Sequence, residues 1–267
     1  MKGKVKRRVI AWVLSFALVM GTVLGGPGLF MKAHAADAGV LYIIDSIGGT
    51  PESVTEDCTD SAGGWSYDAG TATLTLDGFQ GEYIEANGDI NIVLKGKNKI
   101  TISAESTEGI KSTGKVTIDD TISPAQDCLD IYCSDGTESV SMIYTGGFGA
   151  DYATYIVGGT VNLVEENTRR RYVTGISRWA YVENDASLNI NLSADGGRNG
   201  VAALLNLNTS GDTSFRVNSL SSSSYGVYSL DKKGSGDTAL AAEGKAKNID
   251  NKFTIGSTGN TGKITIK

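Results

Sequence analysis

Hydrophobic and polar residues alternate in short runs along most of this chain, and each run follows a turn residue. In such runs every second side chain is apolar, which is the period of a β-strand with one buried face. The sharpest copies begin with glycine: Gly88-Asp-Ile-Asn-Ile92, Gly114-Lys-Val-Thr-Ile118, Gly159-Thr-Val-Asn-Leu163 and Gly262-Lys-Ile-Thr-Ile266. Outside the N-terminal segment, the pattern predicts strands throughout, with a short helical cap near residues 50–57 as the one exception.

These strands recur at a nearly constant spacing. The first aliphatic residue of the phrase recurs every 24–27 residues, apart from one longer gap, at Ile90, Val116, Val161, Leu188, Phe215, Leu240 and Ile264. A second series keeps the same phase at Ile84, Ile110, Ile176, Val201 and Val227. A coil of about 25 residues cannot bury its own apolar face and has to stack on its neighbours. The sequence therefore predicts an all-β fold, a parallel β-helix of about nine coils, with an antiparallel β-sandwich as the alternative.

The spacing breaks in one long segment and stretches in others. Between Val116 and Val161 the period is lost, and we expect an irregular excursion over residues 119–155, which includes Gly146-Gly-Phe-Gly149. In the later coils the two series lie 12–14 residues apart instead of six, which predicts longer loops or an extra strand. Loops on a regular scaffold commonly carry function, so these segments are where we expect a site.

The N-terminus has the three parts of an export signal. A basic start with Arg7 and Arg8 precedes the apolar run Val9–Leu24, and Ala33-His-Ala35 has the small-x-small pattern that signal peptidases recognise. We expect cleavage between Ala35 and Ala36, which divides the chain into a signal peptide (1–35), a lead-in (36–60) and the β-helix (61–267). The predicted location is secreted or cell-surface associated, without membrane contact after cleavage. An uncleaved anchor is the alternative.

Charge and composition narrow the function. The first 35 residues hold six of the 24 Lys and Arg residues and none of the 30 Asp and Glu residues, so the remainder has a net charge near −12. Such a surface argues against nucleic acid and anionic membranes as partners. The one histidine is His34 in the predicted signal, which excludes imidazole-dependent triads and histidine-ligated zinc from the mature chain. We do not expect an enzyme.

Residues 64–102 carry a denser pattern than the repeat requires. It comprises Gly64-Trp-Ser-Tyr-Asp68, Thr71-Ala-Thr-Leu-Thr-Leu-Asp-Gly-Phe-Gln-Gly81, Tyr83-Ile84, Asn87-Gly-Asp-Ile-Asn-Ile-Val-Leu-Lys-Gly96 and Asn98-Lys-Ile-Thr-Ile102. This segment resembles secreted β-helix proteins of anaerobic Gram-positive bacteria described as carbohydrate-binding-domain-containing proteins. The resemblance implies a right-handed parallel β-helix and, in some members, polysaccharide binding with bound calcium.

Two aromatic pairs at a spacing of two residues are the candidate carbohydrate-binding residues. They are Trp65 with Tyr67, and Trp179 with Tyr181 beside Arg178. Flat rings with polar edges suit stacking on sugars, and a guanidinium can bind hydroxyls or a carboxylate. For both pairs the alternative is a structural role. On the strand of Trp179, the neighbouring coils are expected to add Tyr155, Ala203, Leu205 and Tyr228 to the solvent face.

Charged clusters give weaker candidates. Asp119 and Asp120 offer oxygen ligands for calcium, although turn chemistry also explains them. The basic run Arg169–Arg171 either captures an acidic sugar or pairs with Glu165 and Glu166 beside it.

Three cysteines remain in the chain. In an exported protein Cys128 and Cys133 are candidates for a disulfide that closes a small loop, and Cys58 is then left over. The alternative is that all three are buried thiols.

The leading hypothesis is non-catalytic binding of a polysaccharide or cell-surface component. A structural or adhesive scaffold that binds proteins is the alternative, and a calcium-dependent polysaccharide lyase ranks third. A groove lined by aromatic rings would favour the first, and a groove that gathers Asp with Arg the third.

Overall fold

The computed structural model describes residues 40–46, 48–120, 127–136, 138–165, 170, 172–183, 186–192, 197–208, 213–219, 225–233, 238–244 and 264–266. Beyond residue 192 it describes side chains for Val201 and Ala202 only. These residues belong to the second of two units into which the chain divides, Met1–Ala36 and Asp37–Lys267. The described strands stack in parallel, which confirms the predicted parallel β-helix and rules out the β-sandwich.

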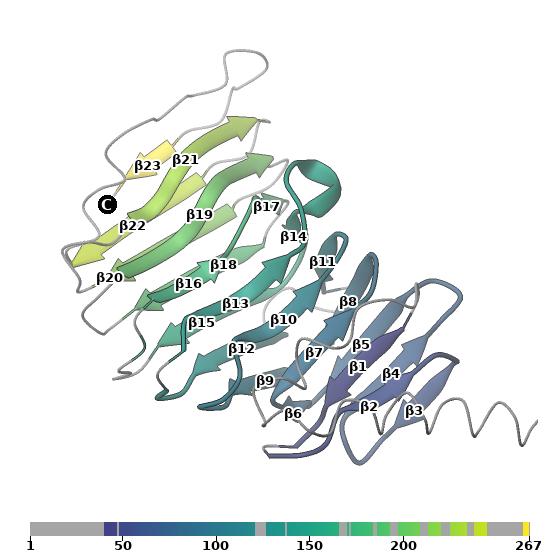
Figure 1. Cartoon of the computed structure of the whole chain (residues 1–267). Helices are drawn as coiled ribbons and strands as arrows, with labels where there is room; N and C mark the ends of the chain where they lie inside the picture. The colour runs from purple at the N-terminus through teal and green to yellow at the C-terminus, as the bar shows by residue number, and fades with distance from the viewer. Residues whose placement is uncertain are drawn as a thin grey trace, which may run out of the picture. The chain divides into compact units, whose positions relative to one another are not determined.

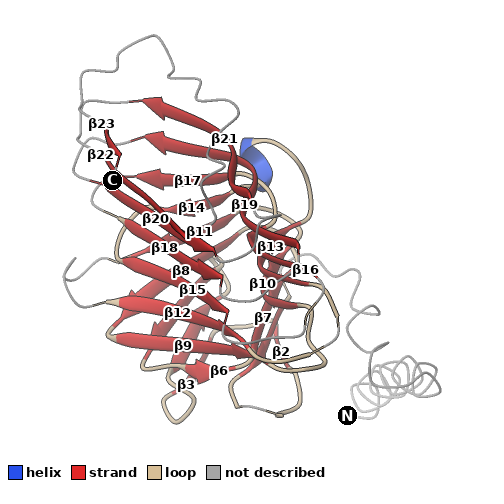
Figure 2. Ribbon diagram, turned by 90° about the vertical axis from the view of Figure 1, so that its left-hand side faces the viewer, coloured by secondary structure: helices blue, strands red, loops and turns tan. Residues whose placement is uncertain are grey.

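In the first four coils three successive strands make one coil, and in the last two a single long strand, β19 or β21, takes the place of the first two, so the coils present three faces (Figures 1 and 2). The first face contains β7 (Tyr83–Ala86), β10 (Glu108–Ser112), β13 (Val140–Thr145), β16 (Tyr172–Ile176), the start of β19 (Gly197–Asn208) and of β21 (Tyr225–Lys233). The second contains β5 (Thr73–Asp77), β8 (Ile90–Lys95), β11 (Val116–Asp119), β14 (Thr154–Ile156), β17 (Ala180–Glu183) and the ends of β19 and β21. The third contains β6 (Gln80–Gly81), β9 (Lys97–Ile102), β12 (Cys128–Cys133), β15 (Thr160–Glu165), β18 (Ser187–Leu192), β20 (Thr213–Ser219), β22 (Thr238–Gly244) and β23 (Ile264–Ile266).

The core consists of columns of aliphatic side chains that repeat from coil to coil. On the first face Ile84 pairs with Ile110 and Ile143 pairs with Ile176, and all are at most 1% exposed. The corresponding columns on the other two faces are Ile92, Ile118, Ile156 and Val182, and Ile100, Ile131, Leu163 and Ile190. Each such side chain gains about 1.5–3 kcal/mol from burial. On the second and third faces the strand neighbours of these residues are half-buried or exposed, so their side chains are available for function.

An antiparallel cap covers the N-terminal end of the stack. It consists of β1 (Leu41–Ile44), β2 (Glu52–Val54), β3 (Cys58–Asp60) and β4 (Trp65–Asp68). Strand β2 occupies the place of the helix expected near residues 50–57, so that expectation is wrong. The antiparallel β1 covers the edge that β7 would otherwise expose, which is a common protection for an edge strand.

The recurring glycine phrase marks two different faces. Gly88 and Gly114 precede second-face strands, whereas Gly159 and Gly262 precede β15 and β23 of the third face. The long gap between Val116 and Val161 therefore contains β12, β13 and β14 in regular register, and the predicted irregular excursion is wrong. Ile110 and Ile143 are 33 residues apart, as are Ile143 and Ile176. Because of these two longer coils and the cap, the described part has six coils and not nine.

The last residue of the first aliphatic series, Ile264, is two positions out of register with Leu240. Ile264 pairs with Thr238, and it is Ile266 that pairs with Leu240. In the coil that begins with β16, the strand β17 is the extra strand expected between Ile176 and Leu188.

One arginine of the predicted basic run lies inside the fold. Arg170 is 1% exposed, and its guanidinium donates hydrogen bonds to the carbonyls of Ser134 (2.9 Å), Ser106 (3.1 Å) and Glu138 (3.3 Å), and to that of Ser103. These carbonyls belong to the turns that follow β9 and β12. Arg170 thus joins the turns of successive coils and is not part of a surface that could capture an acidic sugar; Arg169 and Arg171 lie outside the described residues.

Candidate functional site

A cluster of aromatic rings lies on the second face, the end of β13, the loop between β13 and β14, and the turn before β17. We call it the aromatic patch and define it as Tyr144, Phe148, Tyr155, Arg178, Trp179 and Tyr181. Tyr155 of β14 is in register with Tyr181 of β17, and both point outward because their strand neighbours are buried. Their rings stack with centroids 4.4 Å apart and an angle of 7°. Trp179 is tilted by 42° against Tyr181 at 6.5 Å.

The loop between β13 and β14 supplies the most exposed ring. Phe148 is 69% exposed, in a turn where Gly149 adopts a φ of 96° that favours glycine. At Gly147 a Cβ atom would lie 2.5 Å from the Tyr152 ring, so glycine is required for this close packing. The Tyr155 hydroxyl donates to the carbonyl of Ala150 (3.3 Å) and ties the loop to the second face. The short 3₁₀ helix η2 (Ala150–Tyr152) completes the loop (Figure 1).

Two cations lie against these rings. The Arg178 guanidinium is 4.2 Å from the centroid of the Phe148 ring and 5.8 Å from that of Tyr144. Its Nε is buried and has no hydrogen-bond partner in the described part of the chain. The Lys115 ammonium lies 5.8 Å from the Tyr155 ring. Cation–π contacts of this kind hold a charged group in place while leaving N–H donors for a ligand.

Burial raises the pKa of Tyr155 to about 12, and the neighbouring Tyr181 and Glu183 add to the shift. Since the raised pKa favours the neutral phenol in the folded state, the associated stability is present below about pH 10 and is lost between about pH 10 and pH 12. In a spectrophotometric titration, we expect the wild-type protein to show one more tyrosine with a midpoint near 12 than Tyr155→Phe. Equal numbers of late-titrating tyrosines in the two proteins would contradict this assignment.

The structure brings together one of the two predicted aromatic pairs. Trp179, Tyr181 and Arg178 are joined by Tyr155, as expected from the strand register. Leu205, expected on the same solvent strip, is in register with the buried Ala180, and Asn206 is in register with Tyr181. Phe148 and Tyr144 lie within residues 119–155, where the sequence predicts a site, but the sequence singles out neither ring as a candidate, nor Lys115. The repeated form of Thr154-Tyr-Ile156 and Ala180-Tyr-Val182 is the signal that aligns the two tyrosines.

Trp65 and Tyr67 are core residues of the cap. They are 2% and 6% exposed, so neither ring offers a face to a sugar, and we exclude both from the binding surface. The Trp65 indole Nε1 donates a long hydrogen bond of 3.4 Å to Asp45.

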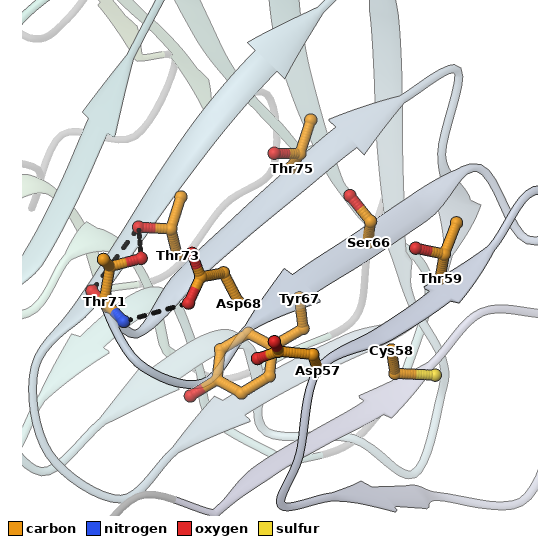
Figure 3. Close-up of a pocket in the computed structure, with 9 residues that line it drawn as sticks. All are labelled: Asp57, Cys58, Thr59, Ser66, Tyr67, Asp68, Thr71, Thr73 and Thr75. Carbon is orange, nitrogen blue, oxygen red and sulfur yellow. Dashed lines mark hydrogen bonds between the residues drawn. The ribbon is translucent and has the colours of Figure 1, made fainter.

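An open hollow of about 410 Å³ lies beside Tyr67 (Figure 3). Hydroxyl and carboxylate groups line it, including Asp57, Asp68, Thr71 and Thr73. These groups largely bond within the protein: Asp68 accepts the Thr71 N–H (3.1 Å), and the hydroxyls of Thr71 and Thr73 bond to each other (2.9 Å). With the Tyr67 ring buried, this hollow lacks a platform for stacking.

The candidate calcium ligand Asp119 makes a local contact, as does the nearby Asp127. Asp119 Oδ1 accepts the backbone N–H of Asp120 (2.8 Å), and Asp127 Oδ1 accepts that of Gly96 (2.6 Å). Burial raises the pKa of Asp127, and Asp120 adds to the shift, because two neighbouring carboxylates disfavour a second charge. Within the described residues no three His, Cys, Asp or Glu side chains gather as a metal site would require.

The predicted disulfide is contradicted. Cys128 and Cys133 lie at the two ends of the same strand, β12, and are not joined. Five residues of extended chain span about 16 Å, far beyond the ~7 Å between Cα atoms that a disulfide tolerates.

The predicted cleavage site, Ala35 and Ala36, lies outside the described residues. In the described part of the chain we find no helix with the length and apolar character of a membrane span.

No family model, curated protein or solved structure matches this chain.

Proposed function

We propose that this chain is a secreted, non-catalytic protein that binds polysaccharide through the aromatic patch. The observation that carries the proposal is the gathering of the five rings of the patch, with the cations Arg178 and Lys115 lying against them. Rings with polar edges on a rigid support suit sugar binding, because the sugar's C–H face packs on the ring while its hydroxyls find donors.

The rings have different parts in this proposal. Tyr155 and Tyr181 cover each other's faces, so they form a stiff base and present their edges. Phe148 and Trp179 lie outside this stack and are the rings that we propose to contact the sugar; Phe148 is 69% exposed and Trp179 is half-buried. Arg178, held against Phe148, directs donors to the same place. Two stacking rings contribute about 1–3 kcal/mol.

The test is affinity electrophoresis in gels that contain cellulose derivatives, xylan, mannan, β-1,3-glucan or polygalacturonate. The wild-type protein should be retarded by at least one of them. Phe148→Ala/Trp179→Ala should bind roughly ten- to a hundredfold more weakly. Tyr172→Ala, which removes a 47% exposed ring of β16 outside the patch, is the matched control and should bind as the wild type does.

Two results would contradict the proposal: wild-type protein that is retarded by none of the polysaccharides, or a double variant that binds as tightly as the wild type. The first result would favour the alternative of a scaffold that contacts proteins. Formation of ultraviolet-absorbing unsaturated products from polygalacturonate, with or without calcium, would contradict the non-catalytic part.

A further inference from the structure

A column of polar side chains runs along the third face, away from the strands that carry the aromatic patch. Asp130 of β12, Asn162 of β15 and Asn189 of β18 occupy the same outward register position, one coil after another, and Lys99 of β9 precedes them. Figure 2 shows these four strands one above the other.

Hydrogen bonds link this column into a chain. The Asn189 amide donates to Asn162 Oδ1 (2.9 Å), and the Asn162 amide donates to Asp130 Oδ1 (2.6 Å). Each amide group has two N–H donors, so each keeps one for a ligand, and Asp130 keeps its second oxygen. The side chains are therefore held in place before any ligand binds, which lowers the entropic cost of binding.

A second column lies two residues further along each strand and forms the other wall of a shallow groove. It consists of Tyr132, Val164 and Asn191. The groove between the two columns has a volume of about 430 Å³. The Lys99 ammonium lies 4.4 Å from the Tyr132 ring centroid and fixes that ring at one end of the groove.

We infer that this groove is a second glycan-binding site, which takes a neutral polysaccharide chain lying along the stacking direction of the coils. Its polar groups repeat at the spacing of neighbouring strands, about 4.8 Å, which is comparable to the length of one sugar residue. Asparagine amides and a carboxylate pair well with neighbouring sugar hydroxyls, and Tyr132 and Val164 supply apolar contact. The Asp130 carboxylate in this column disfavours an acidic glycan.

The inference does not depend on the aromatic patch, and the experiment separates the two sites. Phe148→Ala/Trp179→Ala serves as the background, with affinity electrophoresis in mixed-linkage β-glucan, xylan, mannan and pullulan. This background should still be retarded by at least one of the four. Adding Asn162→Ala/Asn189→Ala should weaken that binding about tenfold or more. Adding Asn91→Ala, the same change at an outward position of β8, should leave it unchanged.

The inferred binding site is overturned if the Phe148→Ala/Trp179→Ala protein binds none of the four polysaccharides, even where the wild type binds one through its aromatic patch. It is also overturned if the added asparagine substitutions change nothing. As a measurement on the unaltered chain, carbodiimide labelling of Asp130 should fall when the retarding polysaccharide is present, whereas labelling of the exposed Asp68 in the cap should not. Undiminished labelling of Asp130 contradicts the inference without relying on any variant.

Discussion

Replacing Arg170 with methionine should lower the free energy of unfolding by about 3–5 kcal/mol, because it leaves buried carbonyls without their donor. The guanidinium bonds to carbonyls of turns in successive coils, among them those of Ser106 and Ser134, while the side chain is 1% exposed. Methionine fills similar space but donates nothing. Denaturant unfolding followed by circular dichroism measures the change.

Two further variants distinguish this interpretation from a general effect of losing positive charge. Arg170→Lys keeps the charge, but an ammonium cannot reach several carbonyls in one plane. The free energy of unfolding of Arg170→Lys should therefore lie between those of the wild type and Arg170→Met. Arg178→Met removes a half-buried cation that rests on aromatic rings and should cost about 1 kcal/mol or less. Equal losses for Arg170→Met and Arg178→Met would contradict the role assigned to Arg170.

The buried columns could be predicted from the sequence because the aliphatic residues of a column recur along the chain at the spacing of one coil. Ile84, Ile110 and Ile176 were placed on one face, and the structure places them there together with Ile143. Ile143 does not follow the period of about 25 residues, because it lies 33 residues from both Ile110 and Ile176. Stacking requires strand register, so the period is visible wherever the corners between the strands keep the same length.

The assignment of strands to faces could not be predicted in the same way. A glycine followed by alternating aliphatics describes the start of any strand after a sharp corner, and this solenoid has such corners on more than one side. Gly114 and Gly159 therefore read alike, although β11 and β15 lie on different faces. Only the pairing partners, which lie a coil away, distinguish them.

The two aromatic pairs show what decides whether predicted binding residues face the solvent or the core. In Trp65-Ser-Tyr67 and in Trp179-Ala-Tyr181 the rings alternate with small residues, and the pattern alone does not say which side faces the core. The residues that follow do: Asp68 is exposed beside the buried Tyr67, whereas Val182 is buried beside the outward Tyr181. Phe148 could not be placed by periodicity, because its loop bends back through glycines over the second face.

The dense pattern at residues 64–102 contains residues that build the scaffold. Gly78-Phe-Gln-Gly81 brings Phe79 into the core at 0% exposure, with its N–H bonded to Asn98 Oδ1 (3.0 Å). A Cβ atom at Gly81 would lie 2.1 Å from the Phe79 ring, so this glycine makes room for the phenylalanine. The motif is thus explained by packing.

This explanation predicts a large difference between two identical substitutions. Phe79→Ala should lower the free energy of unfolding by about 3–5 kcal/mol through the cavity it leaves, while Phe148→Ala, at 69% exposure, should change it by no more than about 0.5 kcal/mol. Polysaccharide binding should follow the opposite order: intact per folded molecule in Phe79→Ala, and weakened in Phe148→Ala. Parallel denaturation and affinity electrophoresis test both orders, and a binding defect in folded Phe79→Ala would mean that the motif contributes to the ligand site after all.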